Sequence, residues 1–322
     1  MKENEIINNI TNEEKIAKAI KENKKGYIGF DPSAISLHLG NYVMINIINK
    51  LKINGFEIVP VVGGATGSIG DPSGKKSERV LQDNKTILRN KLEIVKQLKR
   101  YAHTNFVLDN FDNFKNMNYL DFLRDVGKLI NVNYMLEKDI VKSRLDTGIS
   151  YTEFSYTLMQ GYDFIQFYKK YNIAIQGGGS DQWGNITTGI EMIRKSVGDD
   201  NLASGFTINL LTKSDGTKFG KSEKGAVYLN KDLSSVYDMF QFLINQSDVD
   251  SIKLLKFLTT YEQYKINIIE KLYNSPEMIK LRIPQNALAY FLINEIHSNN
   301  DYNDMIKISK CLFSNDLKSL TK

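Results

Sequence analysis

A short lysine-rich segment has the composition of a loop that handles phosphates. Residues 216–224 read GTKFGKSEK, in which Lys218 and Lys221 lie on either side of a Phe-Gly pair. Gly216 and Gly220 would give such a loop its mobility. Taken alone, a lysine-rich segment with glycines is more typical of a solvated turn, so its chemistry depends on where the fold places it.

A histidine segment near the N-terminus has the features of an anion site. Residues 26–41 read GYIGFDPSAISLHLGN, which predicts a strand, a turn and the start of a helix. His38 and Asn41 are three positions apart and so share one face of the first helical turn, with Gly40 between them. Free amide groups and the helix dipole favour an anion at such a place. An ordinary capped helix with a surface histidine fits the same residues equally well.

A second basic segment follows the next predicted strand. Residues 63–79 read GGATGSIGDPSGKKSER and end in Lys75, Lys76 and Arg79. The spacing is not that of a P-loop, so Walker-type chemistry is not supported. A mobile basic loop over a phosphate fits this segment, and a merely exposed loop fits almost as well.

One face of a predicted helix combines polar groups with the apolar surface of an aromatic ring. In YTEFSYTLMQGYD, at 151–163, Tyr156, Gln160 and Asp163 lie at positions i, i+4 and i+7. Such a face suits a small amphipathic ligand with an ammonium group and a hydroxyl group. The alternative is a solvated stripe with a tyrosine packed flat on it.

A glycine-rich turn completes the set. Residues 176–185 read QGGGSDQWGN, where three glycines allow a ligand to approach the backbone closely. Ser180 or Asp181 would cap the following helix, which begins near Gln182. A nucleotide ribose that is hydrogen-bonded by Asp181 is a plausible use of this turn.

Alternating elements position these segments. Apolar runs predict strands at 26–31, 57–64, 106–109, 173–178 and 206–211, and helical spacing is found at 39–53, 83–102, 118–136, 153–170 and 182–197. This order predicts an α/β fold, a doubly wound, Rossmann-like parallel sheet whose ligand-facing turns share one edge. The candidate segments all follow strands at that edge, which favours a functional interpretation of all of them together.

The domain prediction follows from a change of character near residue 235. We expect a Rossmann-like catalytic domain at 1–208 with a helical insertion at about 73–150, because the helices at 83–136 are long for one crossover. A linker with the KFGKS loop would occupy 209–235. An all-α domain would fill 236–322, where helical patterns follow one another with few glycines.

Composition excludes several classes of protein. The 322 residues carry 42 basic and 37 acidic side chains, a net charge of +5 that permits a polyanionic partner without requiring one. A single cysteine and three scattered histidines make a zinc site improbable. No apolar run approaches the length of a membrane span, and the Glu-rich N-terminus resembles neither a signal nor a transit peptide, so we expect a cytoplasmic protein without a membrane partner.

Together, the motifs resemble one family. HLGN at 38–41 and KFGKS at 218–222 look like the two signatures of the tyrosyl-tRNA synthetases of bacterial and organellar type, which are class I aminoacyl-tRNA synthetases. GFDPSAISLHLG, GGATGSIGDPSG, YTEFSYTLMQGYDF and GGSDQWGN match in order and spacing, and the resemblance covers essentially all of 1–322. It implies activation of L-tyrosine by ATP, in-line attack of its carboxylate on the α-phosphate, and transfer of tyrosine to the 3′ end of tRNA(Tyr).

The resemblance also implies roles for individual residues. It implies that Tyr27 and Asp163 hold the phenol hydroxyl of tyrosine. It implies that Asp71, Tyr156 and Gln160 bind the ammonium group of tyrosine, and that Gln176 and Gln182 lie near its carboxyl side. For ATP and the adenylate it implies Gly29, Asp31, Ser33, His38, Gly40, Gly179, Asp181 and Lys221. For catalysis it implies His38, Asn41, Lys75, Arg79, Lys218, Lys221 and Ser222.

The same resemblance implies partners. ATP would enter as a substrate with Mg²⁺, and neither zinc nor an organic cofactor is expected. The domain at 236–322 would bind the anticodon, and the protein would be a homodimer whose interface we place on the insertion around 118–150 and near Tyr151. Two departures from the family stand out. Asn41 replaces a second histidine that many relatives have, and the usual C-terminal S4-type RNA-binding domain is absent from this sequence.

Three alternatives remain open at this point. Tryptophanyl-tRNA synthetases share the architecture and similar signatures, although Tyr27 and the face of Tyr156, Gln160 and Asp163 favour tyrosine. A non-catalytic RNA-binding or splicing protein on a synthetase body is a second alternative, and the intact His38 argues against it. A free-standing nucleotidyltransferase is the third, but it would not need the helical domain.

Overall fold

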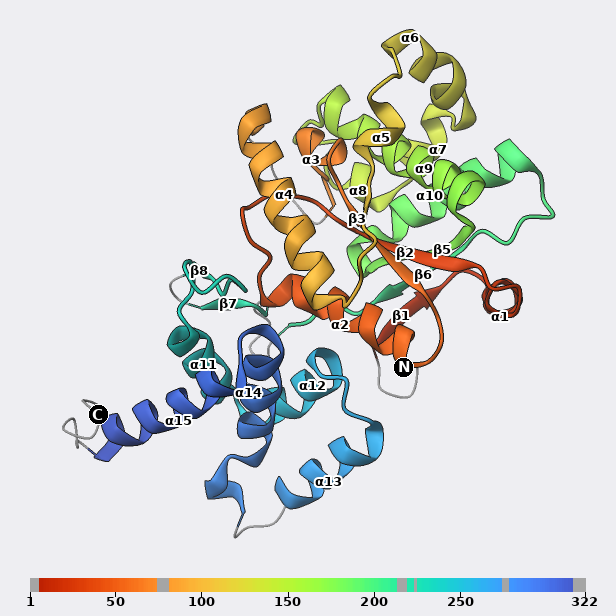
Figure 1. Cartoon of the computed structure of the whole chain (residues 1–322). Coiled ribbons are helices and arrows are strands. Elements are labelled where there is room, and N and C mark those ends of the chain that lie inside the picture. The colour runs from red at the N-terminus through yellow and green to blue at the C-terminus, as the bar shows by residue number, and fades with distance from the viewer. Residues whose placement is uncertain (1–5, 74–80, 213–218, 223–224, 274–277, 315–322) are drawn as a thin grey trace. The chain divides into compact units, whose positions relative to one another are not determined.

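A computed structural model describes residues 6–73, 81–212, 219–222, 225–273 and 278–314, and at residues 140, 221, 222 and 279 it describes the backbone only. The chain divides into two compact units (Figure 1). Unit 1 comprises residues 1–35 and 48–210, and unit 2 comprises residues 36–47 and 211–322. The helix α2 (Leu39–Ile53) therefore contributes residues to both units.

A six-stranded sheet forms the centre of unit 1. Its strands, in the order β1-β6-β5-β2-β3-β4, are β1 (Ile7–Ile10), β6 (Ser204–Ile208), β5 (Ile173–Gly179), β2 (Lys25–Phe30), β3 (Ile58–Val62) and β4 (Leu108–Asp109). All neighbours pair in parallel except β1, which lies antiparallel to β6 at the edge. The predicted doubly wound parallel sheet is confirmed, with β1 as an antiparallel addition.

The edge strand β1 was not among the predicted strands. Its sequence INNI has two polar residues at its centre, and those side chains are exposed. Such a short segment gives no strand signal by itself. It becomes a strand because Ile7 and Ile10 pair with Ile208 and Phe206 of β6, far away in the sequence.

The helices of unit 1 follow the strands and fill the crossover connections. They are α1 (Glu13–Lys21), the later part of α2, α3 (Thr66–Ile69), α4 (Asn84–Tyr101), α5 (Phe111–Phe114), α6 (Tyr119–Asp121), α7 (Val132–Leu136), α8 (Asp139–Lys142), α9 (Tyr151–Tyr171) and α10 (Trp183–Val197). The helices predicted at 39–53, 83–102, 153–170 and 182–197 are thereby confirmed.

The helix predicted at 118–136 is wrong as a single element. This stretch contains α6, a π-helical turn (Phe122–Val126), a 3₁₀ turn (Gly127–Leu129) and α7. The break has a local cause, because the Asn131 side chain accepts a hydrogen bond of 2.8 Å from the amide of Tyr134 and starts a new helix there. Apolar spacing alone did not reveal this cap.

The long helix α9 packs closely on α10, and both lie against β5 (Figure 1). Their close approach depends on two glycines. A Cβ on Gly161 would lie 2.3 Å from the sulfur of Met192, and one on Gly189 would lie 3.1 Å from the ring of Phe164. The polar face of α9 is therefore held at a short distance from the start of α10.

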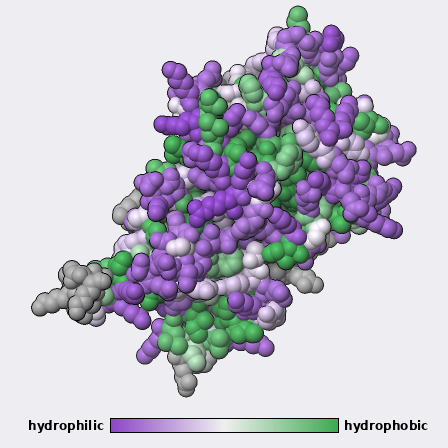
Figure 2. Space-filling model, in the orientation of Figure 1, coloured by the Kyte–Doolittle hydropathy of each residue, from purple (hydrophilic) through white to green (hydrophobic). Residues whose placement is uncertain are grey.

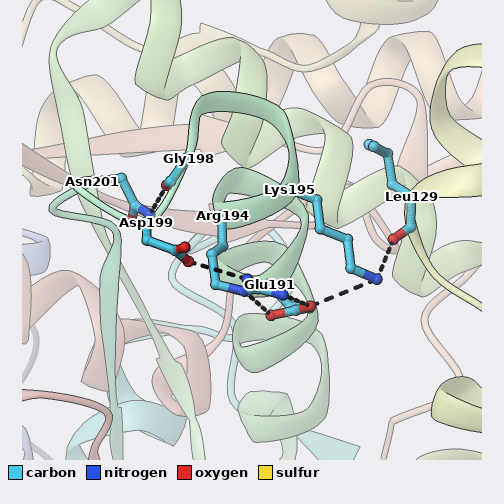
Figure 3. Close-up of polar contacts among 7 residues, drawn as sticks. All are labelled: Leu129, Glu191, Arg194, Lys195, Gly198, Asp199 and Asn201. Atoms are coloured by element: carbon cyan, nitrogen blue, oxygen red, sulfur yellow. Dashed lines mark hydrogen bonds and ion pairs between the residues drawn. The ribbon is translucent and has the colours of Figure 1, made fainter.

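Polar contacts hold the C-terminal end of α10 in place (Figure 3). Arg194 donates to both carboxylate oxygens of Glu191 at 2.8 Å and to Asp199 at 3.1 Å. The hydrogen bond from Arg194 lowers the pKa of Glu191. Lys195 donates at 2.8 Å to the carbonyl of Leu129, which ties α10 to the 3₁₀ turn of the insertion.

Unit 2 is mostly helical, as predicted for the later part of the chain. Its elements are β7 (Lys221–Ser222), β8 (Gly225–Ala226), α11 (Val236–Ile244), α12 (Asp248–Leu258), α13 (Gln263–Tyr273), a 3₁₀ turn (Ile279–Leu281), α14 (Ile283–Ile296) and α15 (Asn299–Ser314). The buried helix α14 contacts the other four helices and forms the core of this group. The start of α2 joins the same unit, because Asn46 donates to the carbonyls of Phe257 and Thr259.

The face of the molecule drawn in Figure 2 is largely polar. Figure 2 shows mainly hydrophilic side chains on the face drawn, with smaller hydrophobic groups between them. Among the helices that the structure describes, none has both the length and the apolar composition needed to span a bilayer.

Candidate active site

The candidate site in unit 1 lies where the parallel strands end. Tyr27 belongs to β2, Asp31 follows that strand, and Thr66 follows β3 in α3. From the facing helix α9, Tyr156 and Asp163 approach the same group of residues. Ligands bind at the carboxyl ends of strands in sheets of this kind, so these side chains lie where a ligand is expected.

Tyr27 lies at the apolar end of this site. It is 3% exposed, and its ring packs against Phe164 and Phe167 with centroids 5.4 and 5.1 Å away. Its hydroxyl is buried and finds no hydrogen-bond partner among the described residues. Burial raises the pKa of Tyr27 well above its usual value, and the charge of Asp163 adds to this effect. A buried, unpaired hydroxyl is costly unless a ligand supplies a partner.

Two asparagines hold the carboxyl group of Asp163. The Asn113 amide donates to Oδ1 at 2.7 Å, and the Asn110 amide donates to Oδ2 at 2.8 Å. Burial raises the pKa of Asp163 to about 8 even though these two donors act in the opposite direction. Asn110 is itself fixed, since its Oδ1 accepts from the amide of Ala65 at 2.8 Å and its Nδ2 also donates to Thr66.

Sequence reasoning missed Asn110, Asn113 and Thr66. The available signal was DNFDN directly after the strand at 106–109, which places two asparagines three positions apart at the ligand edge of the sheet. These residues lie in the short helix α5 and just before it, where the side chains can turn back toward α9. The predicted pair of Tyr27 and Asp163 is therefore the centre of a larger polar group.

Asp31 joins the two sides of the site. Its Oδ1 accepts from the Thr66 hydroxyl at 2.9 Å, and its Oδ2 accepts from the Tyr156 hydroxyl at 3.2 Å. Burial, with the charges of Asp31 and Asp71, raises the pKa of Tyr156 well above its usual value. A Cβ on Gly63 would lie 2.2 Å from Oδ1 of Asp31, so only glycine fits there.

Asp71, Gln160 and Gln182 meet at the other end of the site. Gln182 donates to Oδ2 of Asp71 at 2.6 Å and accepts from Gln160 at 3.3 Å. The carboxylate of Asp71 is also fixed at Oδ1, which accepts from the amide of Ser73 at 2.9 Å. Gln182, which the resemblance places near the substrate carboxyl, lies here against the residues expected to bind the ammonium group.

Gln176 lies beside Tyr27 on the neighbouring strand. The two residues are paired in the parallel register of β5 and β2, so their side chains leave the same face of the sheet. Gln176 is 3% exposed, and its Oε1 is buried without a partner among the described residues. Two buried polar atoms without partners, on paired residues of neighbouring strands, indicate that a polar ligand belongs at this place.

The residues predicted for ATP in unit 1 lie at strand ends. Gly29 is exposed in β2 and has open space where a side chain would be, and Ser33 follows in the turn after that strand. Gly179 ends β5, and a Cβ there would lie 2.7 Å from the carboxylate of Asp181. The backbone at Gly29 is therefore open to close approach by a ligand, whereas the Asp181 carboxylate and the Leu210 side chain occupy the space beside Gly179.

In unit 2, the first signature forms a reciprocal cap at the start of α2. The amide of His38 donates to Oδ1 of Asn41 at 3.1 Å, and the amide of Asn41 donates to Nδ1 of His38 at 3.2 Å. This is the geometry of a capping box. Because Nδ1 accepts a hydrogen bond, the proton of the neutral ring lies on Nε2, which can act as a donor.

The two signatures meet through their backbones. A Cβ on Gly220 would lie 2.7 Å from the amide nitrogen of Gly40, and Gly220 has a positive φ of 88°. Val227 accepts from the amide of Leu39 at 2.9 Å and donates to the carbonyl of Gly220 at 3.0 Å. HLGN and residues 219–222 of the second signature, far apart in the sequence, thus lie together in one compact group, which we call the signature segment (38–41, 219–222 and 225–229).

Of the four basic residues predicted to be catalytic, the structure describes only Lys221, and only its backbone. Lys75, Arg79 and Lys218 lie outside the described residues. Lys221 pairs with Ala226 through the backbone of the β7–β8 hairpin, as does Ser222 with Gly225. Within the described part of the chain, no three side chains of His, Cys, Asp or Glu gather into a group that could hold a metal ion.

Comparison with known proteins agrees with this arrangement. The sequence profile of the family described as "tRNA synthetases class I (W and Y)" matches residues 18–314. The chain belongs to this family of class I tRNA synthetases.

Individual relatives narrow the class. The chain is 58% identical to the "Tyrosine--tRNA ligase" of Ureaplasma urealyticum serovar 10 over all of its own length and 77% of the relative. It is 50% identical to the "Tyrosine--tRNA ligase" of Mycoplasma mobile, over 98% of this chain and 75% of that one. The crystal structure of a C-terminally truncated mitochondrial tyrosyl-tRNA synthetase of Aspergillus nidulans matches with a TM-score of 0.83 and 26% identity, over 97% of this chain and 92% of that chain.

Proposed function

We propose that this chain is a tyrosine–tRNA ligase, which activates L-tyrosine with ATP and transfers it to tRNA. The observation that carries the proposal is the buried hydroxyl of Tyr27, which lacks a partner beside the carboxyl group of Asp163. The relatives that match the whole chain carry the name of this activity. The described residues supply chemically suitable groups for the phenol and ammonium ends of tyrosine, and these support the proposal.

The phenol of tyrosine would enter between Tyr27 and Asp163. A phenol hydroxyl both donates and accepts, so it can donate to the Asp163 carboxylate while it accepts from Tyr27. Phenylalanine would leave the buried Tyr27 hydroxyl unpaired and would offer no donor to Asp163. Tryptophan offers one N–H donor and no acceptor at that end, so it leaves the Tyr27 hydroxyl without an acceptor of its proton.

The ammonium group of tyrosine would bind at the opposite end. Asp71 supplies a carboxylate, and Tyr156 and Gln160 from α9 supply oxygens that can accept from an ammonium group. Gln176 would face the substrate along its length, because its Oε1 is buried and unpaired. Gln182 would assist through Asp71, to which it donates.

The chemistry requires no general base, because a carboxylate is already a nucleophile at neutral pH. The protein must align it with the α-phosphate and stabilise the charge that moves onto pyrophosphate. His38 would donate from Nε2, and Lys75, Arg79, Lys218 and Lys221 would supply positive charge. Mg²⁺ bound to ATP would share this work. The nucleotide would approach the backbone at Gly29, Gly40 and Gly179. Its polar contacts would come from Ser33, Asp31 and Asp181, of which Asp181 would bind the ribose. The phosphate site would be completed by Asn41 and Ser222.

We further propose a homodimer in the cytoplasm, with tRNA(Tyr) bound partly by 236–322. Support for the dimer comes from the apolar side chains that the insertion exposes: Tyr119 is 61% exposed, Leu120 74%, Val132 58% and Tyr151 59%. Tyr119 and Tyr151 also share a side-chain hydrogen bond, so they form one continuous group. We expect Leu120→Asp to produce monomers in sedimentation analysis, and Leu272→Asp, in the exposed face of α13, to leave the dimer intact.

The test of the proposed function is ATP–pyrophosphate exchange with tyrosine, tryptophan or phenylalanine as the amino acid. We expect exchange that depends on tyrosine and on Mg²⁺, with no comparable rate for the other two. Exchange with tryptophan would favour a tryptophan–tRNA ligase, the other activity named in the family description. No exchange with any of them, alongside RNA binding, would favour a non-catalytic role.

A further inference from the structure

Asn185 is a completely buried polar residue behind the ammonium end of the site. It lies in the first turn of α10, has no exposed surface, and is not one of the residues expected to touch the substrate. Its amide has three partners from three parts of unit 1. Oδ1 accepts from the Thr157 hydroxyl at 2.9 Å, and Nδ2 donates to Oε1 of Gln182 and to Oγ of Ser73, both at 3.2 Å.

These partners determine which way the Asn185 amide faces. Thr157 is buried in α9, and its hydroxyl donates a hydrogen bond to Oδ1 of Asn185. Nδ2 of Asn185 must therefore point toward Gln182 and Ser73. The Asn185 amide has one favourable orientation, because a reversed amide would place its NH₂ group against the Thr157 hydroxyl proton and its oxygen against Oε1 of Gln182.

The orientation continues from Asn185 to the substrate-facing carboxylate. Oε1 of Gln182 accepts from Asn185 at 3.2 Å and from Gln160 at 3.3 Å, so the amide nitrogen of Gln182 faces the other way. That nitrogen donates to Oδ2 of Asp71 at 2.6 Å. Ser73, whose Oγ accepts the other hydrogen bond from Nδ2 of Asn185, donates from its backbone amide to Oδ1 of Asp71 at 2.9 Å.

We propose that Asn185 is a positioning residue that aims the Asp71 carboxylate at the ammonium group of the amino-acid substrate. It acts on both oxygens of Asp71 at once, on Oδ2 through Gln182 and on Oδ1 through Ser73. This inference rests on the proposed function, since it assigns the ammonium group of tyrosine to Asp71. It adds a residue that specifies the charged end of the substrate and leaves the phenol end unaffected.

The test measures equilibrium binding to the purified chain by titration calorimetry, with competition against tyrosine for weak ligands. The ligands are L-tyrosine, tyramine and 3-(4-hydroxyphenyl)propionate, which lacks the ammonium group. We expect Asn185→Leu to weaken tyrosine and tyramine about ten- to hundredfold, because hydrogen bonds to charged groups are the strong ones. Binding of the propionate should change less than about twofold, since it makes no ammonium contact.

A milder variant and a matched control accompany this test. Thr157→Val removes only the hydroxyl that orients Asn185, and we expect tyrosine to bind about three- to tenfold more weakly. Thr188→Val is the control, because Thr188 is equally buried on α10 but its hydroxyl donates to the Gly184 carbonyl of its own helix. Thr188→Val should leave the affinity for all three ligands unchanged.

A double-mutant cycle separates positioning from general loosening. If Asn185 acts through Gln182, then Asn185→Leu should weaken tyrosine much less when Gln182→Leu is already present. Equal losses for tyrosine and for the propionate, or fully additive losses in the cycle, would overturn the role of Asn185. A wild-type chain that binds no tyrosine would instead overturn the proposed function itself.

Discussion

The amino-acid site of unit 1 and the signature segment of unit 2 are built by different means. In the amino-acid site, buried side chains hold one another through hydrogen bonds, as Asn110 and Asn113 hold Asp163. In the signature segment, the backbones themselves meet, and Gly40 and Gly220 leave no room for a side chain between them.

The difference follows from what each region must recognise. An amino acid is distinguished by a few polar groups at fixed positions, so recognition requires oriented side chains and is sensitive to a single buried partner. Phosphates are recognised by charge and by backbone amide groups, which need close approach more than a particular side chain. Substitutions should therefore separate amino-acid selection from the rate of activation.

The largest effect is expected from Asp163→Ala. The change leaves the amides of Asn110 and Asn113 without their buried partner, and the tyrosine phenol loses its acceptor. We expect kcat/KM for tyrosine in pyrophosphate exchange to fall about 100- to 1,000-fold, because a buried hydrogen bond to the substrate is lost and buried donors are left unpaired. The KM for ATP should stay within about threefold.

The control for this prediction is Asp71→Asn, which also removes a carboxylate charge but at the ammonium end. It should weaken tyrosine and spare 3-(4-hydroxyphenyl)propionate, whereas Asp163→Ala should weaken both. An unchanged kcat/KM for tyrosine in Asp163→Ala would show that Asp163 does not bind the phenol hydroxyl of the substrate.

The second prediction concerns pH and the same carboxyl group. The pKa of Asp163 is raised from 3.8 to about 8 by burial, so between these values the folded chain keeps a proton that the unfolded chain releases. Stability from this group is therefore highest at low pH and decreases as the pH rises toward 8. We expect the unfolding free energy of wild type, relative to Asp163→Asn, to fall by about 1 kcal/mol per pH unit between pH 5 and pH 7.

Urea denaturation of both proteins at several pH values checks this slope. Asp163→Asn keeps the shape of the side chain and cannot titrate, so the difference between the two curves isolates this group. A difference that does not depend on pH would show that Asp163 stays ionised in the folded protein, held by its two asparagine donors.

The third prediction tests the signature segment. Gly220→Ala places a Cβ in a backbone conformation with φ of 88° and 2.7 Å from the amide of Gly40. We expect kcat for exchange to fall about 10- to 100-fold, because strain of this kind costs about 1–3 kcal/mol. Tyrosine affinity without ATP should stay the same, since the amino-acid site of unit 1 is untouched.

Gly225→Ala is the matched control for Gly220→Ala. Gly225 also has a positive φ, of 112°, but open space surrounds its Cβ position. It therefore reports the conformational strain without the collision at Gly40, and its effect on kcat should be smaller. Equal effects of the two variants would show that the close approach of the two signatures is unimportant.

The smallest effect is expected from Asn41→Ala, which removes one half of the reciprocal cap with His38. Loss of a helix cap costs about 1 kcal/mol, and we expect that decrease in the unfolding free energy. Asn41→Asp keeps the acceptor oxygen and should restore the stability. Thermal unfolding of the two variants gives the comparison, and an unchanged stability of Asn41→Ala would contradict the capping role.

Much of the fold could be predicted from local patterns. The helix expected at 39–53 has those bounds in the structure, and the predicted strands agree with β2 to β6 within a few residues. The period of apolar residues and the glycine-rich turns report directly on the backbone, which explains this agreement. The same reasoning brought the turn after residues 26–31 and the helix face of Tyr156, Gln160 and Asp163 to one edge of the sheet, and the family resemblance added Tyr27.

The sequence by itself determined the class of fold, the family and most residue types of the site, because these are encoded in local period and in spaced motifs. Only the tertiary structure decided which buried atoms pair. The edge strand β1, the asparagines that hold Asp163, the Asn185 network and the meeting of Gly40 with Gly220 all join residues distant in the chain. Such pairings depend on how elements pack, which no local pattern records.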